Sequence, residues 1–373
     1  MIYADNAATT KLDTDAFEAM KPYLLEEYGN PSQPYSFSRS AKAALKQARE
    51  TVASCINAKP CEIYFTSGGT ESDNWAIKSP AFSDTNFRTT IISQIEHPAV
   101  INACSTIERL SHPIAYLDST QDGVITPVEL ERVINNRTTR LVSVMLVNNE
   151  IGTVQPVKEL CSIAHAHGAL FHTDAVPALG HIPVDVHELG IDMLSASAHK
   201  FNGPKGIGFL YMRKGAKILP YADGGGQEFG LRSGTENVAS IVGMAVALKK
   251  NCEAIEANAV HLRALEQIVT ESLDVAKIDY LRNGNKNRVP GSVSLSFRDI
   301  SGEELLHHLD SKGICVSAGA ACKHGNTQIS HVLKAIGLPA EYAKGTIRIT
   351  FGKDNTQEEA RTIAKELLHI IKE

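Results

Sequence analysis

The sequence SASAHKFNGPKG, which spans residues 195–206, joins a run of small residues to a lysine and a glycine-proline turn. We expect a short strand that leads to this lysine, Lys200, inside an otherwise folded chain. Burial lowers the pKa of an amine, because desolvation disfavours the charged form. A lysine that has lost its proton can form a Schiff base with an aldehyde. Ser197 and His199, two residues apart, would point to the same face of the strand.

Another expected strand, upstream in the sequence FHTD of residues 171–174, ends in a carboxylate. One strand that ends in Asp174 and another that ends in His199 and Lys200 form the arrangement that an enzyme with pyridoxal 5'-phosphate (PLP) needs. The lysine holds the aldehyde, and the acid keeps the pyridine nitrogen protonated so that the ring can accept electrons. Taken alone, this pattern is equally compatible with Lys200 being an ordinary surface lysine after a strand. The rest of the chain has to distinguish a cofactor-binding lysine from a surface one.

Strands and helices are expected to alternate around this centre. We expect strands over residues 62–65, 88–93, 114–117, 141–147, 170–173, 193–198 and 208–212, and helices over 15–28, 38–56, 70–78, 98–110 and 157–167. Such alternation is typical of an α/β fold in which helices cover both faces of a mostly parallel sheet. The apolar run 141–147 is typical of a buried parallel strand.

The character of the sequence changes after the glycines of residues 224–226. We expect a long helix over 238–270, an alternating strand with one wet face over 292–297, a helix over 302–312, a strand over 346–351 and a helix over 357–372. A chain of 373 residues is too long for one ordinary core. We therefore expect an N-terminal segment of residues 1–14 that joins the small domain, a large PLP-binding domain of residues 15–250, and a small α+β C-terminal domain of residues 251–373.

Bulk composition excludes several classes of function. The net charge of −5 gives no reason to expect electrostatic attraction to nucleic acid or to an anionic membrane. The longest apolar runs, 141–147 and 241–248, are too short to span a bilayer. The first residues, MIYAD, lack the basic start and apolar core of a signal peptide. We therefore expect a cytoplasmic protein of the soluble globular class.

The cysteines and paired histidines do not indicate a structural metal site. There are seven cysteines, an odd number, and no Cys-x-x-Cys pair, so neither a disulfide framework nor a zinc ribbon is expected. The pairs His165/His167 and His307/His308 have no cluster of carboxylates or cysteines beside them. Most of the cysteines are expected in the core, and one of them could be a nucleophile.

Several motifs lie where an α/β fold collects its ligands. The sequence SGGT of residues 67–70, with Gly69 and Thr70, stands between an expected strand and an expected helix, and a helix start with glycines can bind phosphate. It matches neither a P-loop nor a Rossmann fingerprint. His97 and Asn149 each follow an expected strand, at the sheet edge where ligands bind. An ordinary surface histidine and a plain loop are the alternatives.

Two residues of the C-terminal part can act on a substrate. Cys322 lies in the small-residue loop SAGAACKHGN of residues 317–326, where Lys323 and His324 would favour the reactive thiolate. Arg348 lies within an apolar strand, where an arginine is costly unless it is paired. It could serve a structural carboxylate, or it could hold a substrate carboxylate through two parallel hydrogen bonds. A loop cysteine without function is the alternative for Cys322.

Together these stretches resemble the type I, NifS/IscS-like cysteine desulfurases, a PLP-dependent family of fold type I in the class V aminotransferase superfamily. The resemblance runs nearly end to end. It rests on YADNAATT (3–10), YGNPS (28–32), FTSGGTESDN (65–74), VNNEIG (147–152), the His199-Lys200 stretch, RSGTEN (232–237) and SHVL (330–333) after the Cys322 loop.

The resemblance implies a cofactor site. Lys200 would hold PLP covalently, His97 would stack on its ring, and Asp174 would pair with the ring nitrogen. The residues that would bind the cofactor at its phosphate are Gly69, Thr70, Ser197 and His199, with Thr235 reaching in from the second subunit of a homodimer.

The resemblance also implies a substrate and partners. Asn149 would face the ring oxygen and the substrate, and Arg348 would hold the carboxylate of L-cysteine. Cys322 would attack the substrate sulfur, which leaves L-alanine and an enzyme persulfide. The persulfide would serve a sulfur-acceptor protein, such as an iron–sulfur scaffold or a tRNA thiolation enzyme.

One departure from the family pattern concerns the turn after Asp174. The family has Asp-Ala-x-Gln, and this chain has Asp174-Ala175-Val176-Pro177. Proline has neither a side-chain donor nor a backbone N–H, so a hydrogen bond to the ring oxygen worth about 1–3 kcal/mol is absent. Two other functions stay open: a selenocysteine lyase or C–S lyase on the same fold, which would not need Cys322, and a scaffold without catalysis, which Pro177 would favour.

Overall fold

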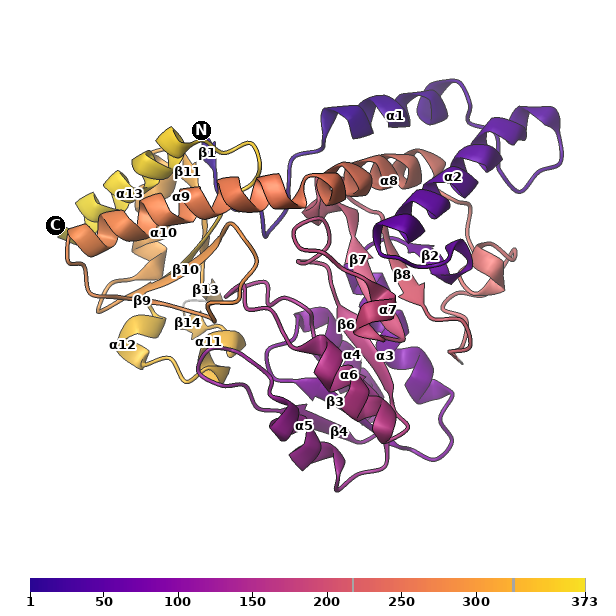
Figure 1. Cartoon of the computed structure of the whole chain (residues 1–373), viewed down its shortest axis with the longest axis horizontal. Coiled ribbons are helices and arrows are strands. Elements are labelled where there is room, and N and C mark those ends of the chain that lie inside the picture. The colour runs from indigo at the N-terminus through magenta and orange to yellow at the C-terminus, as the bar shows by residue number, and fades with distance from the viewer. Residues whose placement is uncertain (217, 324–325, 373) are drawn as a thin grey trace.

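The computed structural model describes residues 1–216, 218–323 and 326–372, with the backbone alone over 320–323 and 326–328, and it contains two main sheets (Figure 1). The large sheet runs in the order β2 (Ile63–Thr66), β8 (Gly208–Met212), β7 (Met193–Ser197), β6 (Leu170–Asp174), β5 (Thr139–Ser143), β3 (Thr89–Ser93) and β4 (Ile114–Leu117). Strand β8 is antiparallel to both of its neighbours, and the other pairs are parallel. The mostly parallel sheet expected from the sequence is confirmed.

Helices cover both faces of the large sheet, because successive residues of its strands point to opposite sides. In β3, Ile91 packs into one hydrophobic cluster and Ile92 into another. Trp75 of α3 lies in the cluster of Ile92, and Val52 of α2 lies in that of Ile91. The helices of this part are α1 (Thr14–Leu25), α2 (Arg39–Cys55), α3 (Gly69–Phe82), α4 (Pro98–Arg109), α5 (Pro127–Ile134), α6 (Val157–Ala166), α7 (Val186–Leu189) and α8 (Val238–Glu253), with short 3-10 turns at Ser36–Ser38, Pro60–Glu62, Ala198–Lys200 and Glu228–Gly230.

The small sheet is antiparallel and has a hydrophobic core of its own. Its order is β12 (Ser317–Ala318), β15 (Thr346–Thr350), β10 (Ser292–Phe297) and β9 (Tyr280–Arg282). Its core receives side chains from α9 (Ile255–Val275), α10 (Gly302–Ser311) and α13 (Gln357–Lys372). The chain start is attached here, because β1 (Ile2–Tyr3) pairs in parallel with β11 (Ile314–Cys315). The remaining elements are α11 (His331–Ala335), α12 (Ala340–Ala343) and the pair β13 (Ala320–Lys323) and β14 (Asn326–Ile329).

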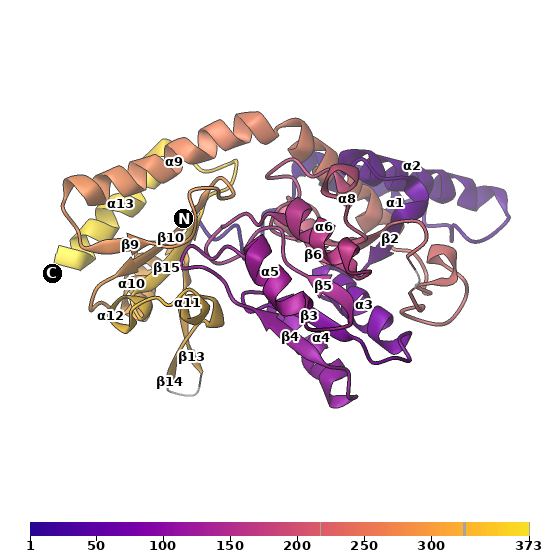
Figure 2. The ribbon, with the colours of Figure 1, turned by 60° about the horizontal axis from the view of Figure 1, so that its bottom comes forward.

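Three sequence expectations were wrong in detail. The single helix expected over 238–270 is two helices that break at Ala254, so that α8 packs on the large sheet and α9 on the small one. The strand expected over 141–147 ends at Ser143. Beyond it, Leu146 still bonds to β6, but β3 has already ended at Ser93 on the other side. The stretch expected to be a loop around Cys322 forms the β13–β14 hairpin, which projects from the small sheet (Figure 2).

The face of β10 that was expected to be wet is buried. All six residues of Ser292–Phe297 are buried, including three serines on one face. Asn283 Nδ2 donates to Ser294 Oγ at 3.1 Å and to Ser296 Oγ at 2.8 Å. These hydrogen bonds replace water as the partners of Ser294 and Ser296. They are needed because this face lies against the rest of the molecule and not against solvent. Among the described residues, no helix combines the length and the apolar character needed to cross a bilayer.

A buried carboxylate joins the start of α1 to two distant segments. Asp13 caps α1, with its Oδ1 accepting from the N–H of Asp15 at 2.9 Å. Lys250 of α8 lies 3.1 Å from Asp13 Oδ1, and Lys353, beyond β15, lies 2.7 Å from Asp13 Oδ2. Burial by itself would raise the pKa of Asp13, but the hydrogen bonds from Lys353 and Lys250 outweigh it and lower the pKa to about 2.

Asp13→Asn should separate the charge of this residue from its capping role, because asparagine caps helices as well as aspartate. We expect the free energy of unfolding to fall by about 1–2 kcal/mol near neutral pH. This lies between the usual cost of losing an exposed ion pair and that of breaking a buried one. The folded pKa lies below the unfolded one, so the stabilisation is present above about pH 4 and is lost as the pH falls toward about 2. Urea unfolding measured as a function of pH checks this. Asp15→Asn, at an exposed partner of Lys250, is the control and should have little effect.

Candidate active site

A cavity of about 560 Å³ opens at the carboxyl-terminal edge of the large sheet. Asp174 ends β6, Ser197 ends β7, and His97 follows β3. The N-terminal segment closes the cavity from outside with Ala8 and Thr9. Because the strands are parallel, their ends bring side chains together that are far apart in the sequence.

Lys200 lies on the wall of this cavity, directly after β7. Its Nζ donates a hydrogen bond to the carbonyl oxygen of Ala8 at 2.9 Å and another to that of Ala7. Burial lowers the pKa of Lys200 to about 8, and the positive charge of Arg348 adds to this effect, whereas Asp174 and Asp5 oppose it. A large share of this amine is therefore neutral near pH 8, as nucleophilic attack on an aldehyde requires.

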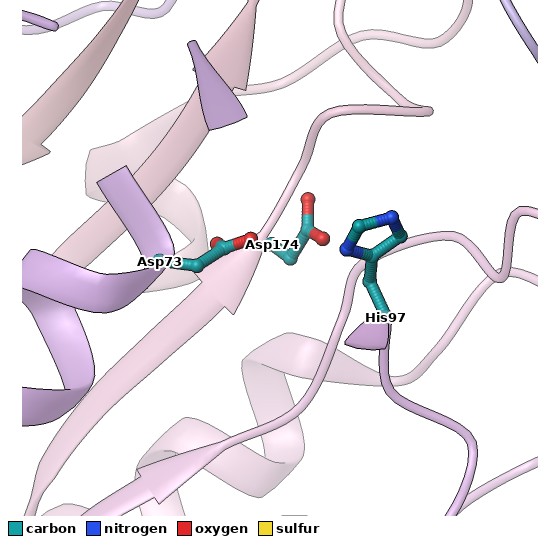
Figure 3. A group of neighbouring side chains, drawn as sticks. All are labelled: Asp73, His97 and Asp174. Atoms are coloured by element: carbon teal, nitrogen blue, oxygen red, sulfur yellow. The ribbon is translucent and has the colours of Figure 1, made fainter. Parts of the chain in front are cut away.

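Asp73, Asp174 and His97 form a buried cluster at one end of the cavity, with Asp174 between the other two (Figure 3). One ligand atom from each residue lies within 4.8 Å of the others. His97 Nδ1 accepts a hydrogen bond from the N–H of Ala99 at 3.1 Å, so the proton of the neutral ring lies on Nε2. The cluster thus offers two carboxyls and one ring N–H to a bound group.

The surroundings of the two carboxyls in the cluster disfavour their charged forms. Burial raises the pKa of Asp174, although His97 and the N–H of Val176 favour its charged form. Burial and the charge of Asp174 raise the pKa of Asp73 well above its usual value. Asp73 Oδ1 has no hydrogen-bond partner among the described residues. Burial thus favours the neutral form of both carboxyls, and a cation beside Asp174 would favour its charged form.

The start of α3 gives the same cavity a cradle for an anion. Gly68 has a φ of +149°, and a Cβ on Gly69 would lie 2.6 Å from Val176 Cγ2, so larger residues cannot bring this loop so close. The backbone N–H groups at the start of α3 attract negative charge. Thr70, Ser197 and His199 line the same cavity. Burial and the charges of Lys200 and Lys205 lower the pKa of His199 to about 4, so its ring is neutral at physiological pH.

These features fit PLP. The cradle suits a phosphate, the cluster around Asp174 suits a protonated ring nitrogen, and the amine of Lys200 on the cavity wall suits an aldehyde. Pro177 lines the cavity beside Lys200, where it offers no hydrogen-bond donor. Asn149 borders the same cavity with an amide that can donate.

Arg348 lies in an adjoining cavity of about 460 Å³, which shares Asn149 with the first. Its Nη1 donates to the carbonyl oxygen of Asn149 at 2.9 Å, and its Nη2 donates to Asp5 Oδ1 at 2.9 Å and to Ser317 Oγ at 3.1 Å. Its buried Nε has no hydrogen-bond partner among the described residues. The guanidinium is therefore held in place on the wall of this cavity by three hydrogen bonds.

Most of the residues singled out in the sequence lie together. Of the ten residues expected at the cofactor and the substrate, Arg348 lines the second cavity. Eight line the first cavity: Gly69, Thr70, His97, Asn149, Asp174, Ser197, His199 and Lys200. Thr235 is exposed in the segment before α8 and does not line the cavity of its own chain. Cys322 lies in β13, and its side chain is outside the described part of the structure, as are residues 324 and 325 with His324.

Sequence reasoning missed the residues that support this site. Asp73 looked like an ordinary helical aspartate, and Asp5 and Ser317 carried no signal of a link to Arg348. Residues 3–10 were read as a loop of small and polar residues. Nothing in that loop indicated that carbonyl oxygens of Ala7 and Ala8 would hold a lysine at position 200. Burial and contact across the fold, which are not local properties, create all of these roles.

Comparison with known proteins places the chain in a family. The aminotransferase class-V family model matches residues 2–363. The chain is 45% identical over 372 residues to cysteine desulfurase IscS of Dictyoglomus turgidum, covering 99% of this chain and 94% of the relative. It is 43% identical over 372 residues to cysteine desulfurase IscS of Methanosarcina thermophila, covering 99% of this chain and 92% of the relative.

Solved structures agree with the sequence relatives. A NifS-like protein superposes with a TM-score of 0.93 at 37% identity, covering 100% of this chain and 99% of that chain. SspA in complex with cysteine superposes with a TM-score of 0.82 at 36% identity, covering 94% of this chain and 99% of that chain. The resemblance and the α/β fold of fold type I are thereby confirmed. The chain belongs to the aminotransferase class-V family and, within it, to the IscS/NifS-like cysteine desulfurases, which are PLP-dependent enzymes.

Proposed function

We propose that this chain converts L-cysteine to L-alanine and passes the sulfur to Cys322 as a persulfide. The observation that carries the proposal is a lysine with a lowered pKa in a cavity that also holds an anion cradle and a buried carboxyl pair, with an arginine on the wall of the adjoining cavity. SspA, at 36% identity over nearly the whole chain, has been solved in complex with cysteine, which supports L-cysteine as the substrate.

The residues of the chain divide the reaction between them. When bound, PLP supplies an electron sink for the negative charge that develops on the substrate's α-carbon. Arg348 would bind the substrate carboxylate and fix its orientation. Lys200 would hold the cofactor and then, as a free amine, move a proton on and off the substrate at Nζ. Asp174 would favour a positive charge at the ring nitrogen, and His97 would cover the ring.

Sulfur transfer belongs to Cys322. Its thiolate attacks the sulfur of the substrate, so that an S–S bond forms while the C–S bond breaks. The electron pair of the C–S bond remains with the carbon fragment, which takes up protons and leaves as L-alanine. Cys322 lies in β13, which pairs with β14 in a two-stranded sheet of its own and follows β12, the neighbour of the Arg348 strand β15. The persulfide then serves an acceptor protein, either an iron–sulfur scaffold or a tRNA thiolation enzyme.

A homodimer completes the site in this proposal. Thr235 is exposed and lies away from the cavity of its own chain, as a residue that acts in a second copy would. Exposed aromatic residues lie before α8 and near α2, where a second copy can bury them: Tyr28, Tyr35, Phe37, Tyr221 and Phe229.

Borohydride reduction of the holoenzyme should fix the cofactor on Lys200, because reduction turns a Schiff base into a stable secondary amine. Peptide mass mapping checks the position, and Lys205→Ala, at another lysine that borders the cavity, is the control and should keep the adduct. The neutral amine forms as the pH rises through its pKa of about 8, so the rate at which apoprotein takes up PLP should rise to a plateau above that pH. An adduct on another residue would refute the assignment.

Arg348→Lys keeps a positive charge but loses the planar fork that binds a carboxylate through two bonds. We expect KM for L-cysteine to rise about tenfold, or about 1.4 kcal/mol of lost binding, while the PLP absorbance stays as in the parent. Steady-state kinetics and the visible spectrum measure the two effects. Arg298→Lys, an exposed arginine paired with Asp279, is the control and should leave KM unchanged. An unchanged KM for Arg348→Lys would make this arginine structural.

Cys322→Ser should bind PLP and L-cysteine and then stop before alanine is released, since a hydroxyl is a far poorer nucleophile toward sulfur than a thiolate. In the parent, brief exposure to L-cysteine should add the mass of one sulfur atom to Cys322, and a reductant should remove it. Cys315→Ser, at a half-buried cysteine of the same sheet region, should load sulfur as the parent does. If Cys322→Ser released alanine and sulfide at the parent rate, the protein would be a C–S lyase or selenocysteine lyase instead.

A further inference from the structure

Two cysteines away from the active site face each other across the contact between α2 and α8. Cys55 is the last residue of α2, and Cys252 lies in the last turn of α8. Both residues are half-buried, and both line the same two surface hollows. Cys104 and Cys161, in contrast, are buried within the hydrophobic clusters of the large sheet. The pair therefore differs from the cysteines that only fill the core.

The thiol pair can be reached from two sides. A hollow of about 450 Å³ and another of about 490 Å³ are each lined by both Cys55 and Cys252. Glu50 and Lys249 border the first hollow, and Asn57 and Pro183 border the second. Each hollow is large enough for a small thiol or disulfide reagent. Access of this kind distinguishes a reactive cysteine from an inert buried one.

The two sulfurs differ in their surroundings. The hydrogen bond from Cys55 lowers the pKa of Cys252, and the backbone N–H of Gly180 adds to this, although burial and Glu253 oppose it. The same hydrogen bond and burial raise the pKa of Cys55. Cys252 is thus the thiol that loses its proton more readily. An attacking thiolate beside a second thiol is the arrangement of a redox-active pair.

We propose that Cys55 and Cys252 are a redox-active thiol pair that closes reversibly into a disulfide between the ends of α2 and α8, with a low-molecular-weight disulfide as the oxidant. The thiolate of Cys252 attacks one sulfur of the reagent, whose S–S bond breaks and releases one thiolate. Cys55 loses its proton and attacks Cys252 Sγ, which releases the second half of the reagent as a thiol. Two protein thiols are oxidised by two electrons, and the reagent is reduced to two thiols.

The pair lies behind the wall that carries Lys200. Gly180, which bonds to Cys252, follows the turn after Asp174, and a Cβ on it would lie 2.9 Å from Asn251 Cβ. Its neighbour His181 shares a hydrogen bond of 2.9 Å with the carbonyl oxygen of Lys200. Asn251 donates to the carbonyl oxygen of Phe201 at 2.9 Å. A disulfide here would tie α2 to the helix end that supports this wall, which stabilises the large-sheet part of the fold by restricting the unfolded chain.

The test is oxidation of the full-length holoenzyme with oxidised glutathione, followed by digestion without reductant. We expect one pair of peptides, containing Cys55 and Cys252, to appear joined, with the mass of two hydrogen atoms lost. Dithiothreitol should separate the two peptides. The oxidised protein should also unfold several degrees higher than the reduced protein, an effect of the size expected for a long closed loop.

Variants make the outcome decisive. In Cys55→Ser, glutathione should stay on Cys252 as a mixed disulfide, and the rise in unfolding temperature should disappear. Cys61→Ser, at an exposed cysteine just after α2, is the matched control and should form the link as the parent does. The proposal would be overturned if the parent carried separate glutathione adducts without a link, or linked Cys61 or Cys315 in place of this pair. Because these readouts do not depend on turnover, they are independent of the proposed desulfurase activity.

Discussion

The hydrogen bonds between the amine of Lys200 and the carbonyl oxygens of Ala7 and Ala8 hold the active site together. A buried ammonium is costly unless polar groups surround it, and here the backbone of the N-terminal segment supplies them. Those carbonyls can solvate the charged amine, yet they do not prevent its loss of a proton, because they carry no full charge. The pKa of Lys200 therefore settles at about 8. This balance keeps the amine both positioned and reactive.

The same N-terminal segment ties the cofactor cavity to the substrate cavity. Asp5 accepts hydrogen bonds from Arg348 and Ser317, and β1 pairs with β11 beside the small sheet. The positions of Lys200 and Arg348 are therefore not independent. A shift of the segment would move the partners of both residues at once. The two charges also act on each other directly, since Arg348 lowers the pKa of Lys200.

Burial controls the charge of the side chains that line the cofactor cavity. It raises the pKa of both Asp174 and Asp73, and the charge of Asp174 raises that of Asp73 further. Neutral His199 and the start of α3 make the same cavity suitable for an anion as well. Pro177 lines the cavity without a hydrogen-bond donor, whereas Asn149 borders both cavities with an amide that can donate.

The sequence by itself determined the α/β class, most element positions and the residues of the cofactor cavity. Those properties follow from local periodicity and from the rule that parallel strands present their carboxyl ends at one edge, as Asp174, Ser197 and His97 do. Tertiary structure alone decided which distant groups meet. Lys200 bonds to a carbonyl 192 residues away, and Arg348 bonds to a carboxylate 343 residues away. It also buried the serine face of β10 and broke the long helix at Ala254. The physical reason is that burial and contact depend on how the layers pack against each other, and a pattern along one strand or helix does not contain that information.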